Sequence, residues 1–301
     1  MILVFGTLCL DRVRQVPFLP PVGGYVGVTS EQEVLGGEAA NTAFALLKWG
    51  VRFGFYPNAI GNDLSGQHVN RLAKAKGLPA LERMGPLWKT PVCDIYVTPD
   101  GERTMFGVGF TELGESVDPA DVPLPSSGWV TVDMNLGDAG RQVVARAECA
   151  CYVMDLPEPV VKPGDVWQGS TDWLGVRGNE SANRALVAER VEAWGCAVIL
   201  SDGANGLIAG SPTLPARAFP AFPCPSLVDS TGSGDLFRAA MLYGLDHGWA
   251  FNDCLRFATA AGALGCQYLG ASERIPTVAE IDRHIQDNPA VASAYDLDPT
   301  P

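Results

Sequence analysis

The sequence predicts an α/β protein whose central sheet is mostly parallel and covered by helices on both faces. Short apolar runs typical of strands alternate with longer segments typical of helices, and this alternation favours a parallel sheet. The first run, residues 2–6, is apolar and ends in glycine, which is the profile of a buried strand. A chain of 301 residues, 47% of them hydrophobic, is long enough to bury a substantial core.

Strands are expected where short runs of apolar or β-branched residues are bounded by turn residues. Two of them, joined by a turn that contains Asp100 and Gly101, form a predicted hairpin. Residues 13–35 mix prolines, glycines and β-branched residues, and we expect the short exposed strands and turns of a lid there rather than core. The other expected strands cover residues 2–6, 51–59, 92–97, 104–108, 129–133, 151–155, 172–176 and 198–201.

Helices are expected where apolar residues recur at helical spacing and a glycine or capping residue marks an end. The last of them starts at Thr277, which with Glu280 fits a capping box behind Pro276. The tail from residue 288, rich in Ala, Asp and Pro, is expected to be loosely held. The expected helices cover about 42–49 and 62–77, start near 138, end near 194, start near 233, and cover 252–264.

Composition and charge exclude several classes of function. The formal net charge of −13 argues against a surface that binds nucleic acid or an anionic membrane. The apolar runs are too short to span a membrane, and the first residues lack the basic flank and cleavage site of a signal peptide, so we expect a cytoplasmic protein. The eight cysteines and three histidines show no metal-ligand or redox spacing.

Residues 229–235, Asp-Ser-Thr-Gly-Ser-Gly-Asp, combine an anion cradle with a carboxylate. The small residues Gly232, Ser233 and Gly234 let backbone N–H groups converge where a helix is expected to start, and such groups attract phosphate. Asp235 in the first turn would take a proton from an attacking hydroxyl beside that anion. Helix capping by Thr231 or Ser233 would explain only one residue of this stretch, so the whole stretch indicates phosphoryl transfer.

The same seven residues closely resemble the C-terminal signature of the ribokinase family of carbohydrate and nucleoside kinases, also called the PfkB family. Residues 36–41, Gly-Gly-Glu-Ala-Ala-Asn, resemble the N-terminal signature of that family. Residues 61–66 resemble its Gly-x-Asp-x-x-Gly element, and residues 201–206 resemble its nucleotide-side Thr-x-Gly-x-x-Gly motif with Ser in place of Thr. These matches follow the family order along nearly the whole chain.

The resemblance implies a single ribokinase-like domain over residues 1–301, a three-layer α/β/α fold with a small β lid near residues 11–35 and 90–112. It implies transfer of the γ-phosphoryl group of ATP to a hydroxyl, most often a primary one, of a sugar or sugar derivative. Asp235 would be the general base, and the amides of Gly232, Ser233 and Gly234 would stabilise the transferring charge. For one acceptor residue, Asp133, helix capping is an equal alternative. The implied acceptor-binding residues are Asp11, Gly36, Gly37, Asn41 and Asp133.

The resemblance also implies a nucleotide site with Mg²⁺. Glu180 would bind Mg²⁺ through water and phosphate, and Asp229 would bind a monovalent cation such as K⁺. Three positions depart from the family pattern: Ala182 replaces the second acid of an Asn-x-x-Glu motif, Thr259 replaces a frequent asparagine, and Arg274 stands where a small residue often helps to bind the cation. The Arg274 guanidinium would either replace potassium or face solvent. The implied nucleotide-binding residues are Asn179, Glu180, Ser201, Gly203, Gly206, Thr231 and Thr259.

Two alternatives remain open from the sequence. A nucleoside would suit Asp11 and Asn41 as well as a free sugar, because its ribose offers similar hydroxyls. A regulatory protein that kept the fold and lost catalysis would explain Ala182, although the intact Gly-Ser-Gly and Asp235 argue against it. The expected partners are a small-molecule sugar or nucleoside and, through the lid, a second copy of the chain. Nucleic acid and membranes are not expected.

Overall fold

A computed structural model describes residues 1–79 and 81–296 of the protein. Its large sheet has eight strands in the order β14-β13-β12-β11-β10-β9-β1-β4, and all neighbours pair in parallel except β12 with β13 and β13 with β14. The predicted mostly parallel sheet is therefore confirmed. The strands are β1 (Ile2–Gly6), β4 (Phe53–Pro57), β9 (Trp129–Asp133), β10 (Ala150–Met154), β11 (Val166–Ser170), β12 (Ala197–Ser201), β13 (Leu207–Ser211) and β14 (Leu214–Phe219).

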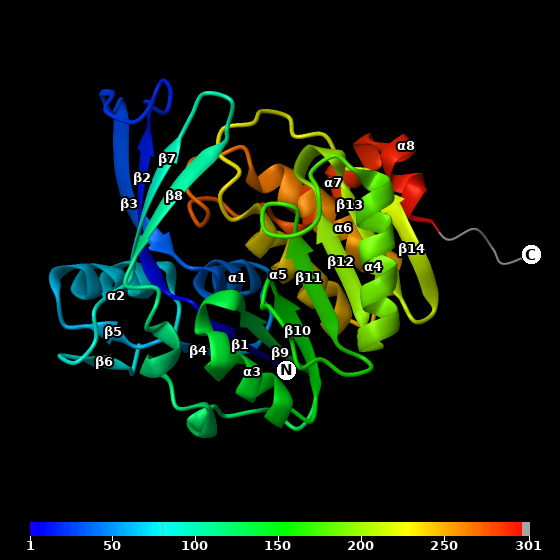
Figure 1. Ribbon diagram of the computed structural model, residues 1–301, viewed down its shortest axis with the longest axis horizontal. Helices are drawn as coiled ribbons and strands as arrows, with labels where there is room; N and C mark the ends of the chain where they lie inside the picture. The colour runs from blue at the N-terminus through cyan, green and yellow to red at the C-terminus, as the bar shows by residue number, and fades with distance from the viewer. Residues whose placement is uncertain (80, 297–301) are drawn as a thin grey trace, which may run out of the picture.

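Helices cover both faces of the large sheet and bury two separate apolar cores (Figure 1). Successive side chains of a strand point to opposite faces, so Ile2 and Val4 of β1 enter one core while Leu3 and Phe5 enter the other. The predicted three-layer fold is confirmed by this arrangement. The first core is covered by α1 (Glu38–Lys48), α5 (Ser233–Asp246) and α6 (Phe251–Gly265), and the second by α3 (Gly137–Arg146) and α4 (Glu180–Trp194).

A four-stranded sheet, called the small sheet below, stands away from the large sheet at the upper left of Figure 1. It consists of β3 (Ser30–Gly36), β2 (Cys9–Gln15), β7 (Val92–Val97) and β8 (Arg103–Val108), in that order. The predicted hairpin is confirmed, because β7 and β8 pair antiparallel from Val97 and Arg103 onward. The expectation that residues 13–35 contribute no core is wrong, since one face of the small sheet buries Val13, Val34, Ile95 and Val97.

One expected strand, at residues 172–176, is wrong. These residues form a turn in which Trp173 and Val176 are exposed, and the strand is β11, just before them. Sequence pattern favoured the wrong run because β11 contains Gln168 and Gly169, which are poor strand signals. In the fold Gln168 is buried and accepts a hydrogen bond from the Tyr152 hydroxyl at 2.7 Å, so a tertiary contact stabilises the strand.

Capping residues mark the ends of two helices. Asp63 caps α2 (Leu64–Lys76) by accepting from the Gly66 amide, and Gly77 ends that helix in the left-handed conformation. Thr277 and Glu280 form the expected capping box at the start of α7 (Val278–Asp287). A further pair of short strands, β5 (Ile60–Gly61) and β6 (Met84–Gly85), precedes and follows α2. Within residues 1–79 and 81–296, no helix combines the length and the apolarity that a membrane span needs.

The expectation of a loosely held tail is wrong as far as residue 296. Residues Pro289–Ala292 form α8, and the Tyr295 ring is buried and stacks on Phe219 and Phe222. Composition suggested an unpacked segment because Ala, Asp and Pro dominate it, but one aromatic side chain supplies the apolar area that anchors it. The last part of that tail, residues 297–301, lies outside the described residues.

The parallel strands bring polar side chains together at one edge of the large sheet. Their carboxyl ends point the same way, and this edge of an open α/β sheet is where ligands bind. The side chains that end or follow β1, β9, β10, β11 and β12 are Thr7, Asp133, Asp155, Ser170 and Asp202.

Candidate active site

Asp235 is a buried carboxylate in the first turn of α5. Asn41 of α1 donates from Nδ2 to its Oδ2 at 2.8 Å, and the Arg238 guanidinium lies 3.6 Å from its Oδ1. Burial raises the pKa of Asp235 to about 6, while Arg238 and the Asn41 hydrogen bond act in the opposite direction. A carboxyl with this pKa is suited to exchange protons near neutral pH.

The start of α5 brings backbone N–H groups next to Asp235. Gly232 caps the helix with a φ of 76°, and a Cβ at this position would lie 2.2 Å from the Ala271 Cβ, so only glycine fits. At Gly234 a Cβ would meet only Met154 and Gln168, at 3.7 and 3.8 Å. The Ser233 N–H is already used in a turn, where it donates to the Ser230 carbonyl at 3.3 Å. The helix terminus remains an anion-attracting position because its first N–H groups lack intrahelical partners.

Asp229 organises the loop that precedes α5. Its Oδ1 accepts from the amide and hydroxyl of Thr231, at 2.9 and 2.6 Å, and its Oδ2 accepts from the Gly270 amide at 2.8 Å. The carboxylate is fully buried, so these three bonds replace its hydration. Asp229 thus ties the loop to residue 270. Thr231 was expected to bind the nucleotide, but its hydroxyl already donates to Asp229.

Asp11, one of the residues expected to bind the acceptor, has a buried side chain on β2. Its Oδ1 accepts from the Cys9 thiol at 3.1 Å, and burial raises its pKa to about 7. The glycine at position 36 is explained by this carboxylate, because a Cβ there would lie 2.0 Å from the Asp11 Cγ. At Gly37, with a φ of 98°, a Cβ would lie 2.4 Å from the Thr7 carbonyl oxygen. The paired glycines therefore have a structural reason that does not involve a ligand.

Asp133 is fully buried at the end of β9. Its two oxygens accept from the amide and the hydroxyl of Thr7, at 2.6 and 2.7 Å, and Oδ1 also accepts from the Asn135 amide at 3.3 Å. Burial raises the pKa of Asp133, and Arg238 opposes this shift. These contacts favour the capping interpretation, because they join β1 to the turn after β9.

The residues expected on the nucleotide side lie mainly around the end of β12. The Ser201 hydroxyl donates to the Gly169 carbonyl at 3.2 Å. Gly203 and Gly206 have φ values of 54° and 92°, and a Cβ at Gly206 would lie 2.1 Å from the Phe219 carbonyl oxygen. Thr259 lies on α6, where its hydroxyl donates to the Leu255 carbonyl at 2.8 Å. The turn after β12 thus requires glycine for its own conformation.

Glu180, the residue expected to bind Mg²⁺, and its neighbour Asn179, expected on the nucleotide side, do not form a protein cradle for Mg²⁺. Asn179 caps α4 by accepting from the Ala182 amide at 3.1 Å, and the exposed Glu180 side chain pairs with Arg184. Among the described residues, no group of three or more His, Cys, Asp or Glu side chains is arranged to hold a metal ion. Mg²⁺ bound with a nucleotide would therefore depend on the phosphates and water for most of its ligands.

The interpretation in which Arg274 replaces a cation near residues 229–231 finds no support. Its guanidinium donates to the Tyr268 hydroxyl at 2.7 Å, lies over the Tyr268 ring and pairs with Glu280. The side chain is exposed on the surface next to α7. These contacts favour the solvent-facing alternative.

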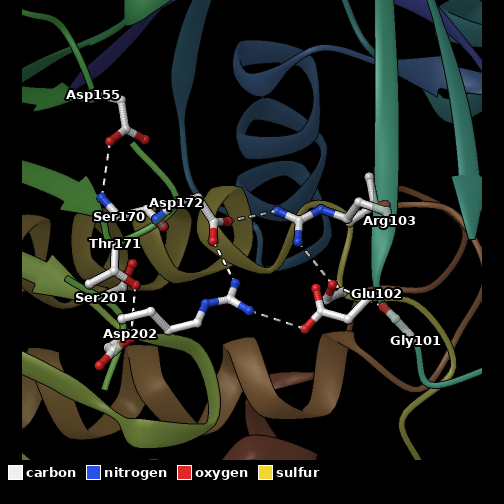
Figure 2. Close-up of polar contacts among 12 residues, drawn as sticks. Gly101, Glu102, Arg103, Asp155, Ser170, Thr171, Asp172, Ser201 and Asp202 are labelled. Atoms are coloured by element: carbon white, nitrogen blue, oxygen red, sulfur yellow. Dashed lines mark hydrogen bonds and ion pairs between the residues drawn. The ribbon is translucent and has the colours of Figure 1, made fainter. Parts of the chain in front are cut away.

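Arg103, the first residue of β8, was not predicted from the sequence to lie near this site. Its Nη1 donates to the Ser230 hydroxyl at 3.0 Å, and Ser230 in turn donates to the Gly101 carbonyl at 3.0 Å. Figure 2 shows its guanidinium pointing to Asp172, at 3.5 Å. Asp172 also pairs with Arg177 at 2.6 Å, and Arg177 lies 3.5 Å from Glu102. The tip of the small sheet is thus connected to the loop before α5 and to the loop after β11.

Asp155 and Arg238 were also missed. Asp155 follows β10 with a φ of 52° and accepts from the Ser170 amide at 3.1 Å (Figure 2), and burial raises its pKa to about 7. Arg238 is fully buried on α5. The available signal for Arg238 was a charged residue inside an otherwise apolar and alanine-rich helix, three positions after Asp235.

Comparison with known proteins gives consistent matches. A family model described as pfkB family carbohydrate kinase matches residues 171–278. An uncharacterized sugar kinase of Dictyostelium discoideum is 28% identical, over 95% of this chain and 97% of that protein.

Two solved structures share the fold. Ribokinase of Arabidopsis thaliana, complexed with ribose and ATP, gives a TM-score of 0.72 at 20% identity and covers 94% of this chain and 97% of that chain. A nucleoside kinase of Burkholderia thailandensis, complexed with inosine, gives a TM-score of 0.74 at 19% identity. The match covers 95% of this chain and 97% of that chain.

We expect Asp11→Asn to raise the free energy of unfolding at pH 8. The folded-state pKa of about 7 exceeds the ordinary value of 3.8, so the folded protein binds the proton more tightly, and stability falls as the pH rises through this window. The gain from removing the buried charge is at most about 4 kcal/mol. Urea unfolding at pH 5 and pH 8 measures it, with exposed Glu112→Gln as the control. An equal effect of Asp11→Asn at both pH values would contradict the prediction.

Proposed function

We propose that this chain, which belongs to the PfkB family of carbohydrate kinases, transfers the terminal phosphoryl group of ATP to a hydroxyl of a sugar or nucleoside. The observation that carries the proposal is the buried Asp235 carboxylate in the first turn of α5, next to the N–H groups of the helix terminus. Relatives bound to ribose with ATP and to inosine support both kinds of acceptor.

Asp235 would act as the general base. The acceptor hydroxyl gives its proton to a carboxylate oxygen of Asp235 as its own oxygen attacks the γ-phosphorus. The bond from that phosphorus to the β–γ bridging oxygen breaks, and ADP leaves. Oδ1 is the oxygen suited to this task, because Oδ2 already accepts from Asn41.

The protein would stabilise the transferring phosphoryl group with backbone dipoles and one guanidinium. Gly232, Ser233 and Gly234 begin α5, where the helix dipole favours negative charge. Arg103 reaches the same loop through Ser230, so its positive charge would lie near the phosphates. Mg²⁺ would reduce the charge of the nucleotide, and Asp229 would be the position for a monovalent cation.

The acceptor would bind between α1 and the small sheet. Asp11, Asn41 and the backbone at Gly36 and Gly37 border this space, and the Asn41 Oδ1 is buried without a hydrogen-bond partner among the described residues. Asp133 would shape the floor through Thr7 rather than bind the acceptor directly.

The ATP would lie on the other side of Asp235, along β12 and α6. The residues proposed there are Asn179, Glu180, Ser201, Gly203, Gly206, Thr231 and Thr259.

The small sheet would act as a lid over the acceptor. Its tip contacts the loop before α5 through Gly101 and Ser230 and the loop after β11 through Asp172 and Arg177 (Figure 2). Closure of this kind excludes water from the transferring phosphoryl group, since hydrolysis of ATP competes with transfer.

An ATP-consumption screen over pentoses, hexoses, sugar acids, sugar phosphates and nucleosides tests the proposed reaction. We expect turnover with at least one acceptor and a roughly 10²- to 10⁴-fold lower rate for Asp235→Asn, the usual effect of removing a positioned base. Exposed Asp282→Asn on α7 is the control and should keep the wild-type rate. Binding of sugars or ATP without turnover on any acceptor would contradict the proposal and favour a regulatory protein.

Gly234→Ala tests whether glycine is needed at this position for binding a ligand or for the fold itself. The residue is helical and the added methyl would meet nothing closer than 3.7 Å, so we expect an unchanged or higher Tm. Turnover should fall at least about 10-fold, because the methyl would stand where phosphoryl oxygens approach the helix terminus. Thermal unfolding and steady-state rates measure the two effects, with Gly85→Ala as the control. Wild-type turnover in a stable Gly234→Ala protein would remove this residue from the proposed anion site.

A homodimer through the small sheet is proposed from its edge strand. Three apolar side chains of β8, Met105, Phe106 and Val108, are 42, 57 and 59% exposed, and an exposed apolar edge favours pairing with another chain. We expect a dimer by light scattering and a monomer for Phe106→Lys, whereas Val160→Lys, another exposed apolar position, should leave the mass unchanged. A wild type that stays monomeric at every concentration measured would contradict this interface.

A further inference from the structure

We propose that Arg238 is a positioning residue for Asp235: its buried guanidinium keeps the carboxylate ionised at neutral pH and directs the unoccupied oxygen, Oδ1, to the acceptor. The inference deepens the proposed function and rests on the role of Asp235 as the base. It concerns a residue that does not touch the transferring phosphoryl group.

The geometry fixes the guanidinium against both helices that form the site. Arg238 lies three residues after Asp235 on α5 and is fully buried. Its Nε donates to the Thr42 hydroxyl at 2.9 Å, and its Nη2 donates to the Glu38 carbonyl at the start of α1. The same Nη2 lies 3.6 Å from the Asp235 Oδ1. α1 therefore holds the cation at ion-pair distance from the carboxylate.

A buried guanidinium needs a countercharge. Removing a charged group from water costs several kcal/mol unless it is paired and hydrogen-bonded. The Thr42 hydroxyl and the Glu38 carbonyl are neutral, so they satisfy donors without balancing the charge. The ionised Asp235 is the carboxylate at ion-pair distance and supplies part of that balance, and Arg238 in turn stabilises the charged form of Asp235.

The other charges around Asp235 make Arg238 necessary. Four buried or half-buried acids interact with Asp235: one of them, Asp133, raises its pKa, and Asp235 raises the pKa of the other three, while two cations lower the pKa of Asp235. Burial is the largest cause of the raised pKa of Asp235, and Arg238 is the largest opposing one. Loss of Arg238 would leave the base protonated over much of the neutral range. The acids are Asp11, Glu38, Asp133 and Asp155, and the cations are Arg103 and Arg238.

The two oxygens of Asp235 differ in their hydrogen bonding, and Arg238 lies next to the free one. Asn41 occupies Oδ2, whereas Oδ1 is buried and has no hydrogen-bond partner within residues 1–79 and 81–296. The Arg238 Nη1 and the Glu38 Oε2 are buried without partners in the same sense. Oδ1 is therefore the oxygen left to receive a proton, and the guanidinium next to it holds the carboxylate in that orientation.

The test measures the titration of Asp235 directly. In protein labelled with ¹³C-carboxyl aspartate, the signal absent from Asp235→Asn identifies the residue. We expect the wild-type midpoint below pH 7, and we expect Arg238→Met to raise it by roughly one to three pH units while Arg238→Lys raises it less. Equal midpoints in wild type and folded Arg238→Met would overturn the proposal. If Arg238→Met does not fold, the wild-type titration decides by itself: an Asp235 midpoint above pH 8 would overturn the proposal.

Kinetics separate this proposal from the proposed function. With the best acceptor from the screen, the acid limb of the pH profile of kcat/KM should move to higher pH in Arg238→Met, and the rate should recover at pH values above that limb. A merely structural defect would instead lower the rate at every pH. A shifted carboxyl titration with an unshifted pH–rate profile would uphold the role of Arg238 toward Asp235 and refute Asp235 as the base.

Discussion

The burial of the Asp235 charge is the constraint on which the arrangement of the site depends. A carboxylate removed from water must recover its solvation from the protein, and here the amide of Asn41 and the guanidinium of Arg238 supply it. Both groups require α1 to pack closely on α5, because Asn41 lies on α1 and Arg238 is oriented by Thr42 of α1. The two glycine-containing helix starts are therefore brought together by the same contacts that stabilise the Asp235 carboxylate.

Two glycines at the site, Gly6 and Gly36, have a common physical cause. Acidic side chains lie directly against the backbone, so a Cβ at Gly6 would meet the Asp133 carboxylate at 2.0 Å and a Cβ at Gly36 would meet that of Asp11. Close approach lets buried acids use backbone N–H groups instead of water, as Asp133 does with Thr7 and Asp229 does with Gly270. At Gly36 the need for glycine thus follows from a neighbouring acid and requires no ligand.

Much of the fold was predictable because its signals are local. Strand and helix alternation, the Asp63 and Thr277 caps and the hairpin turn each depend on a few adjacent residues. The start of α5 near residue 233, with Asp235 in its first turn, was predictable for the same reason. Errors arose where distant contacts decide the structure: β11 is stabilised through Gln168 and Tyr152, and the tail is anchored by Tyr295 on Phe219.

The missed site residues share a related cause. Helical spacing in α5 indicated one apolar face, but the helix packs between α1 and α6 and buries every residue from Asp235 to Leu242. From the sequence, a charged residue at position 238 is therefore expected on the surface, although Arg238 lies in the core of the fold. Arg103 is equally ordinary in sequence, because only the closure of residue 101 onto residue 230 brings it near α5.

Arg103 and Arg238 place positive charge near Asp235 in two different ways. Arg238 belongs to the packed core, so its effect on the carboxylate is constant as long as α1 and α5 remain together. Arg103 is carried by the small sheet, and its contribution to the charge balance of Asp235 depends on the contact between Ser230 and the hairpin tip. A movement of the small sheet away from the loop would therefore withdraw one cation and admit water together. The core guanidinium stays beside the Asp235 carboxylate in either position, whereas the hairpin guanidinium adds its charge only when the hairpin tip contacts the loop before α5.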